Sequence, residues 1–226
     1  MSIQYSPKII TDGLVLALDA ANVKSYPGSG TSWVNLNGNN NNGTLTNGPT
    51  FDGGNGGSIV VDGVNDYIDF SDSGLLPTVG LTVSTWYKTS VADKWLVDKA
   101  AGNLDSTGYK LISNSDGSLS CFVNATSVGT AAGFIAANAG RWMNIVFTWT
   151  PSTSIILYSQ GTQLNINTTS IPASINNPSA NLRVAGRANN TDYWNGNVAQ
   201  VFIYGRALSS DQVLQNFNAT RSRFGV

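Results

Sequence analysis

The sequence predicts an all-β fold in which two antiparallel sheets pack face to face, with one short helix near the C-terminus. Three observations predict it. Short segments of alternating apolar and polar residues recur along the chain, turn signals rich in Gly, Asn and Asp separate them, and helical periodicity is nearly absent. The 226 residues are enough for a sizeable core and no linker divides them, so we expect a single domain over residues 1–226.

Twelve segments carry the strand pattern. In Trp142–Trp149, for example, the odd-numbered positions hold Met, Ile, Phe and Trp, so one face of this strand is entirely apolar. The pair Asp116-Gly117 lies between two apolar runs and predicts a hairpin with a type I′ turn. The expected strands are Leu14–Leu18, Ser58–Val61, Tyr67–Phe70, Leu81–Lys88, Lys94–Asp98, Tyr109–Ile112, Leu119–Val123, Trp142–Trp149, Ile155–Ser159, Leu164–Asn167, Leu182–Ala185 and Val198–Tyr204.

One helix is expected near the C-terminus. Ser209 and Gln212 have the spacing of a capping box, with Ser209 at the N-cap and Gln212 at the third helical position. Val213, Leu214 and Phe217 follow at helical spacing, so this helix should pack one apolar edge onto the sandwich.

Three further segments lack a clear strand or helix pattern. Residues 35–57 are expected to form a long ordered loop. Residues 1–12 are extended and partly apolar, so they either dock as an arm on a neighbouring protein or pair with their own sandwich as an outer strand. The C-terminal tail, residues 219–226, carries Arg221, Arg223 and Phe224 and is a second candidate contact.

Composition excludes several classes of function. Only 11% of residues are charged, against about 25% in an average domain, and the net charge is −1, so we expect no nucleic-acid partner. The chain has no His, and all 13 acidic residues are Asp. Ser-His-Asp catalysis and imidazole metal sites are therefore impossible, and a glycosidase would have to use two Asp residues. No strand shows a suitable pair, so we expect no catalytic residues and no enzyme activity.

The environment of the protein is also constrained by sequence. Cys121 is the lone cysteine and cannot form an intrachain disulfide; we expect it to be a buried strand residue. Residues 13–21 are apolar, but Asp19 interrupts them and no basic segment precedes them, so they do not resemble a signal peptide. No apolar run reaches the ~18 residues of a spanning helix, so membrane insertion is not expected.

Oxygen-bearing side chains gather at one predicted turn. Asp62, Asn65 and Asp66 would supply ligands that Ca²⁺ accepts. The alternative is turn chemistry, because Asp and Asn side chains commonly bond the backbone of their own turn. No cofactor is required by the sequence, and calcium is the one metal that this cluster would suit.

Aromatic residues divide into two groups by their place in the pattern. Trp86, Trp142 and Trp149 lie within strong strands and are expected in the core. Trp95, Tyr109, Tyr193 and Trp194 lie near turns and are the better candidates for exposed, ligand-binding rings. Exposed rings in a weakly charged protein would suit sugars, whose apolar faces stack on them.

Several stretches of the sequence resemble a known family. VDGVNDYIDF (61–70), LTVSTWYK (81–88), RWMNIVFTW (141–149) and YWNGNVAQVFIYGRALSSDQV (193–213) are similar to laminin-G-like domains of the concanavalin A-like lectin/glucanase superfamily. Residues 13–51 resemble the opening of a subgroup often found in bacteriophage structural proteins. The resemblance implies a jelly-roll sandwich. It also implies a packing role for Trp194, in competition with ligand binding.

A function follows as an expectation from this resemblance and the composition. We expect a bacteriophage virion structural protein, a capsid decoration or a tail- or fibre-associated module, exposed on the particle surface and made without a signal peptide. Its partners would be other virion proteins and host-surface glycans, and it would be a homo-oligomer or part of a larger assembly. The alternative is a carbohydrate-binding module of a secreted enzyme or adhesin.

Overall fold

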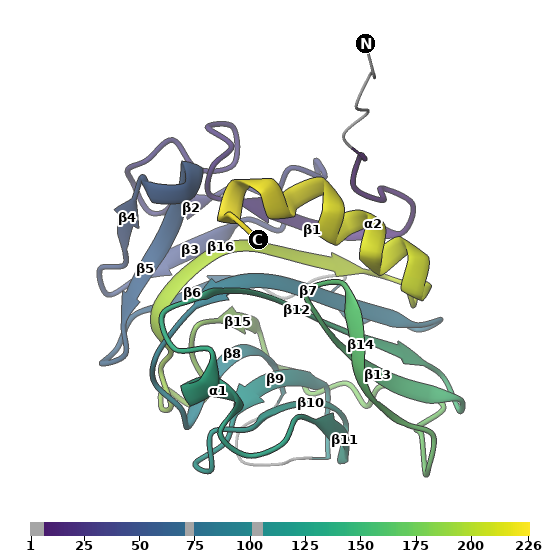
Figure 1. Ribbon diagram of the computed structural model, residues 1–226. Helices are drawn as coiled ribbons and strands as arrows, with labels where there is room; N and C mark the ends of the chain where they lie inside the picture. The colour runs from purple at the N-terminus through teal and green to yellow at the C-terminus, as the bar shows by residue number, and fades with distance from the viewer. Residues whose placement is uncertain (1–6, 71–74, 101–105) are drawn as a thin grey trace.

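The computed structural model describes residues 7–70, 75–100 and 106–226, and within them two eight-stranded antiparallel sheets pack face to face (Figure 1). The strands of sheet A run in the order β14-β13-β12-β7-β16-β5-β4. Strand β16 pairs with β5 through its first half and with β1 through its second half. The strands of sheet B run in the order β11-β10-β9-β8-β15-β6-β3-β2. The predicted all-β sandwich with a short C-terminal helix is confirmed.

The strands differ in length between the centre and the edges of each sheet. Sheet A contains β1 (Leu14–Asp19), β4 (Thr50–Asp52), β5 (Ser58–Asp62), β7 (Leu81–Lys88), β12 (Trp142–Thr150), β13 (Ser154–Ser159), β14 (Thr162–Asn167) and β16 (Asn195–Tyr204). Sheet B contains β2 (Ser32–Trp33), β3 (Gly43–Thr46), β6 (Tyr67–Phe70), β8 (Lys94–Lys99), β9 (Tyr109–Ser113), β10 (Leu119–Val123), β11 (Thr126–Gly129) and β15 (Leu182–Val184).

The core lies between the two sheets and follows the two-residue period of the strands. In β12, Met143, Ile145, Phe147 and Trp149 all point into this core, as predicted. Cys121 of β10 is buried among them, also as predicted. Burial at this density is the main force that holds the sandwich together.

The outer face of sheet A is covered by helix α2 (Ser210–Thr220) and the short 3₁₀ helix η2 (Arg221–Phe224), which lie over β16 and β7 (Figure 1). Ser209 caps α2 through both hydrogen bonds of the predicted capping box. Trp86 and Trp142 are buried as predicted, but they lie beneath α2 and η2 and not between the sheets. The even-numbered residues of β12, such as Trp142, point away from the space between the sheets. Helices α2 and η2 cover this outer face with a second apolar layer.

Some local predictions are wrong. The Asp116-Gly117 hairpin forms, but only Gly117 has a positive φ (76°), and a type I′ turn needs two such residues. The turn is instead closed by Gly117 N–H, which donates to Asn114 O at 2.9 Å. Two short elements were not predicted at all: Thr126–Gly129 is strand β11, and Phe134–Ala137 is the single-turn helix α1.

The expected long loop at residues 35–57 contains strands β3 and β4 and the 3₁₀ helix η1 (Gly54–Gly56). At its start, asparagine side chains replace a neighbouring strand along the edge of β1. Ala17 N–H donates to Asn35 Oδ1 at 2.9 Å, and Asn37 Nδ2 donates to Leu14 O at 2.7 Å. Side-chain amides therefore form hydrogen bonds with backbone groups of β1 that would otherwise be free to pair with another chain.

Both ends of the described chain fold back onto the sandwich. Ile10 N–H donates to Asn216 Oδ1 of α2 at 2.7 Å, and Tyr204 of β16 donates to Ile10 O at 2.9 Å. Residues 7–12 are thus bound to their own fold, through helix contacts and not as the predicted outer strand; residues 1–6 of the expected arm lie outside the described residues. The C-terminal tail does not project either, because Phe224 is buried against Trp86.

No helix in the described part of the chain is long and apolar enough to cross a membrane.

Candidate functional site

Two of the four aromatic residues predicted to bind a ligand are in the core. Tyr109 is fully buried, and its hydroxyl donates to Leu75 O at 2.8 Å. Trp194 is also fully buried, with its ring edge-on to Tyr87 at a centroid distance of 5.2 Å. The expectation of exposure is wrong for both, because each side chain points to the inner face of the sandwich, as the family resemblance implied for Trp194.

The other two, Trp95 and Tyr193, lie together on the outer face of sheet B. Trp95 is only 8% exposed, and the guanidinium carbon of Arg187 lies 4.2 Å from the centroid of its ring. Tyr193 stacks on Tyr67 at 6.1 Å, and Arg183 lies over the ring of Tyr67 at 4.2 Å. We call these five residues the cation-capped cluster.

The cations of this cluster are themselves paired. Arg183 forms an ion pair with Asp69 at 3.1 Å, and Arg187 forms one with Asp192 at 3.1 Å. A sugar could stack on Trp95 or Tyr67 only by displacing a paired guanidinium. The structure therefore places the predicted residues Trp95 and Tyr193 in the same cluster. Their rings, however, already contact arginine and tyrosine side chains of the same chain.

The predicted calcium cluster forms a hydrogen-bonded turn. Asp62 Oδ1 accepts from the N–H of Val64 at 2.8 Å, and Asp66 Oδ2 accepts from the N–H of Asp62 at 3.1 Å. Burial, and to a smaller extent the nearby charge of Asp62, raises the pKa of Asp66, which disfavours its ionised form. Asn65 contributes its carbonyl, which accepts from Asn47. Among the described residues, no three acidic or Cys side chains gather as a metal site would need.

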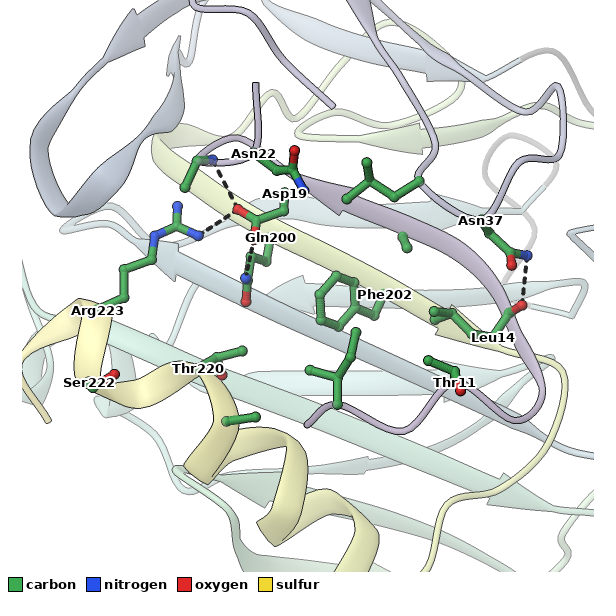
Figure 2. Close-up of a pocket in the computed structure, with 15 residues that line it drawn as sticks. Thr11, Leu14, Asp19, Asn22, Asn37, Gln200, Phe202, Thr220, Ser222 and Arg223 are labelled. Carbon is green, nitrogen blue, oxygen red and sulfur yellow. Dashed lines mark hydrogen bonds and ion pairs between the residues drawn. The ribbon is translucent and has the colours of Figure 1, made fainter. Parts of the chain in front are cut away.

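A groove of about 480 Å³ lies on the outer face of sheet A, between strands β1 and β16 on one side and the end of α2 with η2 on the other (Figure 2). Its floor is apolar, with Leu14, Ala17 and Phe202 from the two strands. Its rim is polar and mostly uncharged. The residues of the rim and walls are Ile9, Thr11, Asp19, Ala21, Asn22, Leu36, Asn37, Gln200, Ala219, Thr220, Ser222 and Arg223.

One end of the groove is built around Asp19. Arg223 of η2 donates to Asp19 Oδ1 at 2.5 Å, and Gln200 Nε2 of β16 donates to Asp19 Oδ2 at 2.7 Å (Figure 2). The N–H of Ala21 also donates to Asp19 Oδ1, at 2.9 Å. Arg223 is further held by the carbonyl oxygens of Asn55 and Gly57. The ion pair thus ties the C-terminal tail to β1.

Gln200 is the exceptional residue of this end. It is only 4% exposed, and its Oε1 has no hydrogen-bond partner within the described chain, although its Nε2 is bonded to Asp19. Leaving a buried acceptor unpaired is unfavourable by about 1–3 kcal/mol. Gln200 Oε1 is one of several such buried side-chain atoms in the described part of the chain. Gln200 lines the groove, with Oε1 on the side away from Asp19 (Figure 2).

The groove was not predicted from sequence, because its walls come from residues 9–37 and 200–223, which only the fold brings together. Two signals pointed toward it. Asp19 interrupts the apolar run of residues 13–21, and Gln200 interrupts the apolar strand that ends at Tyr204. A polar residue in a buried position needs a partner, and here these two residues are partners of each other.

Several solved structures of binding domains share this fold. The binding domain of botulinum neurotoxin serotype D, solved with N-acetylneuraminic acid, has a TM-score of 0.71 and 14% identity, covering 92% of this chain and 51% of that one. The binding domain of Paraclostridial Mosquitocidal Protein 1 has a TM-score of 0.69 and 20% identity, covering 92% and 52%. This chain therefore spans about half the length of those structures, and at such identities the likeness shows the fold alone.

A search of curated proteins finds no match. The family model described as the concanavalin A-like lectin/glucanases superfamily, of the laminin G type, matches residues 62–214. That match covers more than half of the chain and includes most of both sheets. The chain belongs to the laminin-G-like branch of the concanavalin A-like lectin/glucanases superfamily.

Proposed function

We propose that this chain is a structural protein of a bacteriophage virion, displayed on the capsid or tail, and that it binds host-surface glycans without cleaving them. Its lectin-like fold supports the binding function. The resemblance of residues 13–51 to phage structural proteins, and a surface rich in amides and hydroxyls in place of charge, support the virion context.

The observation that carries the glycan-binding part of the proposal is the groove on sheet A. Small-molecule sites are concave and largely apolar, with a few polar groups that fix orientation. The apolar floor of Leu14, Ala17 and Phe202 suits the C–H face of a pyranose ring. The hydroxyls of Thr11 and Ser222 and the amide of Gln200 suit sugar hydroxyls, which both donate and accept hydrogen bonds.

The same groove argues against hydrolysis. Glycosidases place two carboxyl groups on either side of the scissile bond. Asp19 is the one carboxylate among the residues that line the groove, and it already accepts from Arg223, Gln200 and Ala21. The lining residues therefore offer no second carboxyl to complete a glycosidase pair with Asp19.

Related folds in receptor-binding proteins are consistent with a binding role. One of the similar toxin domains was solved with N-acetylneuraminic acid, and another, from botulinum neurotoxin DC, with rat synaptotagmin II. These partners belong to those proteins. They support only the view that the fold is used for attachment, which is the role proposed here for the phage particle.

Two measurements test the proposal. Mass spectrometry and antibody labelling of purified, intact particles should find the chain on the particle surface, and a glycan array probed with the purified protein should give saturable binding to at least one cell-surface glycan. Detection only as part of a secreted enzyme would favour the alternative of a carbohydrate-binding module. Absence of binding to any glycan would contradict the lectin function.

A further inference from the structure

We propose that the groove binds the end of a glycan chain, a stretch of about one or two sugar rings, and not an internal segment of a polysaccharide. This inference rests on the proposed glycan-binding function and specifies which part of the glycan is bound. It is carried by the walls of the groove, which the fold places on all four sides, and by the volume that they enclose.

The ion pair of Asp19 and Arg223 crosses one end of the groove. Asp19 comes from β1 and Arg223 from η2, which lie on opposite sides of the groove, and the two side chains meet at 2.5 Å (Figure 2). Gln200 of β16 donates to Asp19 and is only 4% exposed, so the strand is covered at this end. Arg223 also donates to the carbonyl oxygens of Asn55 and Gly57, and these contacts hold its side chain across the groove.

The N-terminal segment, residues 8–12, crosses the other end, between α2 and the start of β1 (Figure 2). Backbone atoms of this segment are bound to side chains of α2. Gln215 Nε2 donates to Lys8 O at 2.8 Å, and Ile10 N–H donates to Asn216 Oδ1 at 2.7 Å. A ligand could displace the segment only by breaking these hydrogen bonds, so this end of the groove is closed as firmly as the first.

The two long sides of the groove are also walled. On one side, residues 35–37 run along the free edge of β1, where Leu36 N–H donates to Ala17 O at 2.9 Å. On the other side lie Ala219 of α2 and Ser222 of η2. The groove is therefore enclosed on four sides and open to solvent above. An extended chain that lay along its floor would have to rise over a wall at each end, whereas a chain end meets a wall only once.

The enclosed volume limits the length of the ligand. Sites of about 300–1,000 Å³ bury most of a drug-sized ligand, and the groove measures about 480 Å³. A monosaccharide or a disaccharide is a ligand of this size. A longer chain must leave the groove over one of its walls, so its further rings stay in solvent and add little apolar contact.

The test is a length series with the wild-type protein, measured by titration calorimetry. The probes are linear oligosaccharides of increasing length, made by partial acid hydrolysis of each polysaccharide that binds on the glycan array and separated by size. We expect the affinity to stop rising at the disaccharide and to change by less than about twofold for longer chains. We also expect the number of protein molecules bound per chain to stay constant as the chain lengthens, because lengthening adds internal rings but no ends.

Two variants assign this behaviour to the groove. Ala219→Leu fills the groove without removing a hydrogen bond, and Leu is a good helix former at this position in α2. Asn218→Leu is the matched control, because it places the same side chain one residue earlier, on the exposed side of the helix. We expect disaccharide binding to be lost in Ala219→Leu and unchanged in Asn218→Leu, with melting curves to verify that both variants fold.

Two results would overturn the inference and leave glycan binding in place. One is a number of bound protein molecules that grows with chain length, or an affinity that keeps rising beyond the disaccharide, since either shows that internal segments bind. The other is binding that Ala219→Leu does not change, which would remove the site from this groove. Absence of binding to any saccharide would instead contradict the proposed function on which the inference rests.

Discussion

The outer faces of the two sheets are built from the same kinds of residue but differ in the space beside them. On sheet B, the rings of Trp95 and Tyr67 are covered by Arg187 and Arg183, and each arginine has an aspartate partner. On sheet A, the ion pair of Asp19 and Arg223 lies at the end of an open groove, beside a buried amide oxygen with no partner.

This difference teaches that aromatic residues alone do not mark a binding surface. The cation-capped cluster has the composition of a sugar platform, but its rings and charges stabilise each other. The groove has one aromatic residue on its floor, Phe202, yet it combines open volume with an apolar floor and polar side chains around it. The second combination is the better indicator of a ligand, and four predictions test it.

The largest effect is expected where the C-terminal tail closes the outer layer of sheet A. Phe224 stacks on Trp86 at a centroid distance of 4.0 Å and contacts Trp142 at 4.9 Å. Phe224→Ala should lower the free energy of unfolding by about 3–5 kcal/mol, because it leaves a cavity beneath η2. Urea denaturation measures this loss of unfolding free energy. Val226→Ala, at a side chain 45% exposed, is the control and should change stability by less than ~0.5 kcal/mol.

The next effect concerns sheet B and depends on pH. Burial raises the pKa of Asp98 to about 6, against the opposing effects of the Ala188 N–H, Lys110 and Arg187. The folded protein then holds a proton between pH ~4 and 6 that the unfolded chain has lost, so this carboxyl reduces stability as pH rises through that window. The stability of Asp98→Asn relative to wild type should therefore rise by up to roughly 3 kcal/mol between pH 4 and 7. Parallel stability profiles of the two proteins would contradict the burial of this charge.

A smaller effect is expected at the ion pair of the groove. Asp19→Asn leaves the partly buried Arg223 without its counter-ion. We expect the free energy of unfolding to fall by about 2 kcal/mol and glycan binding to weaken. Asp12→Asn removes an ion pair with Arg206 in which Asp12 is 86% exposed, so its loss should stay below ~1 kcal/mol. Chemical denaturation measures both variants. Equal losses of unfolding free energy in Asp19→Asn and Asp12→Asn would show that the Asp19 ion pair contributes no more than an exposed one.

The smallest effect is expected at the residue that sequence favoured. Tyr193→Ala should leave the affinity for glycans unchanged, because Tyr193 lies in the cation-capped cluster and not in the groove. Calorimetric titration of this variant checks the point. A marked loss of affinity would show that glycans bind on sheet B and not in the groove on sheet A.

The fold was predictable from local patterns, since alternation located the central strands and the capping box located α2. Strands β6, β7 and β10 have the predicted bounds. Strands β2, β3 and β4 were missed because they are short and lie in a stretch rich in Gly and Asn, residues that are typical of turns. Short edge strands are held by their neighbours and by amide side chains such as that of Asn35, which local patterns do not reveal.

The groove depends on contacts between distant parts of the chain. Asp19 and Arg223 are 204 residues apart, and Asp19 and Gln200 are 181 apart. The tail was predicted only as a candidate contact, and no local pattern indicates its return to β1. Exposure of the aromatic residues was also misjudged, because nearness to a turn does not determine which face of a sheet a side chain takes, as Tyr109 shows.

The central claim is that glycans bind in the groove on sheet A, which Gln200 lines, and not on the aromatic residues of sheet B. The most direct measurement is a nuclear magnetic resonance titration with a neutral glycan that follows the side-chain amide of Gln200 and the indole N–H of Trp95 in the same spectra. The account predicts a saturable shift of the Gln200 amide while the Trp95 signal stays in place. A saturable shift of Trp95 with an unchanged Gln200 amide would contradict it.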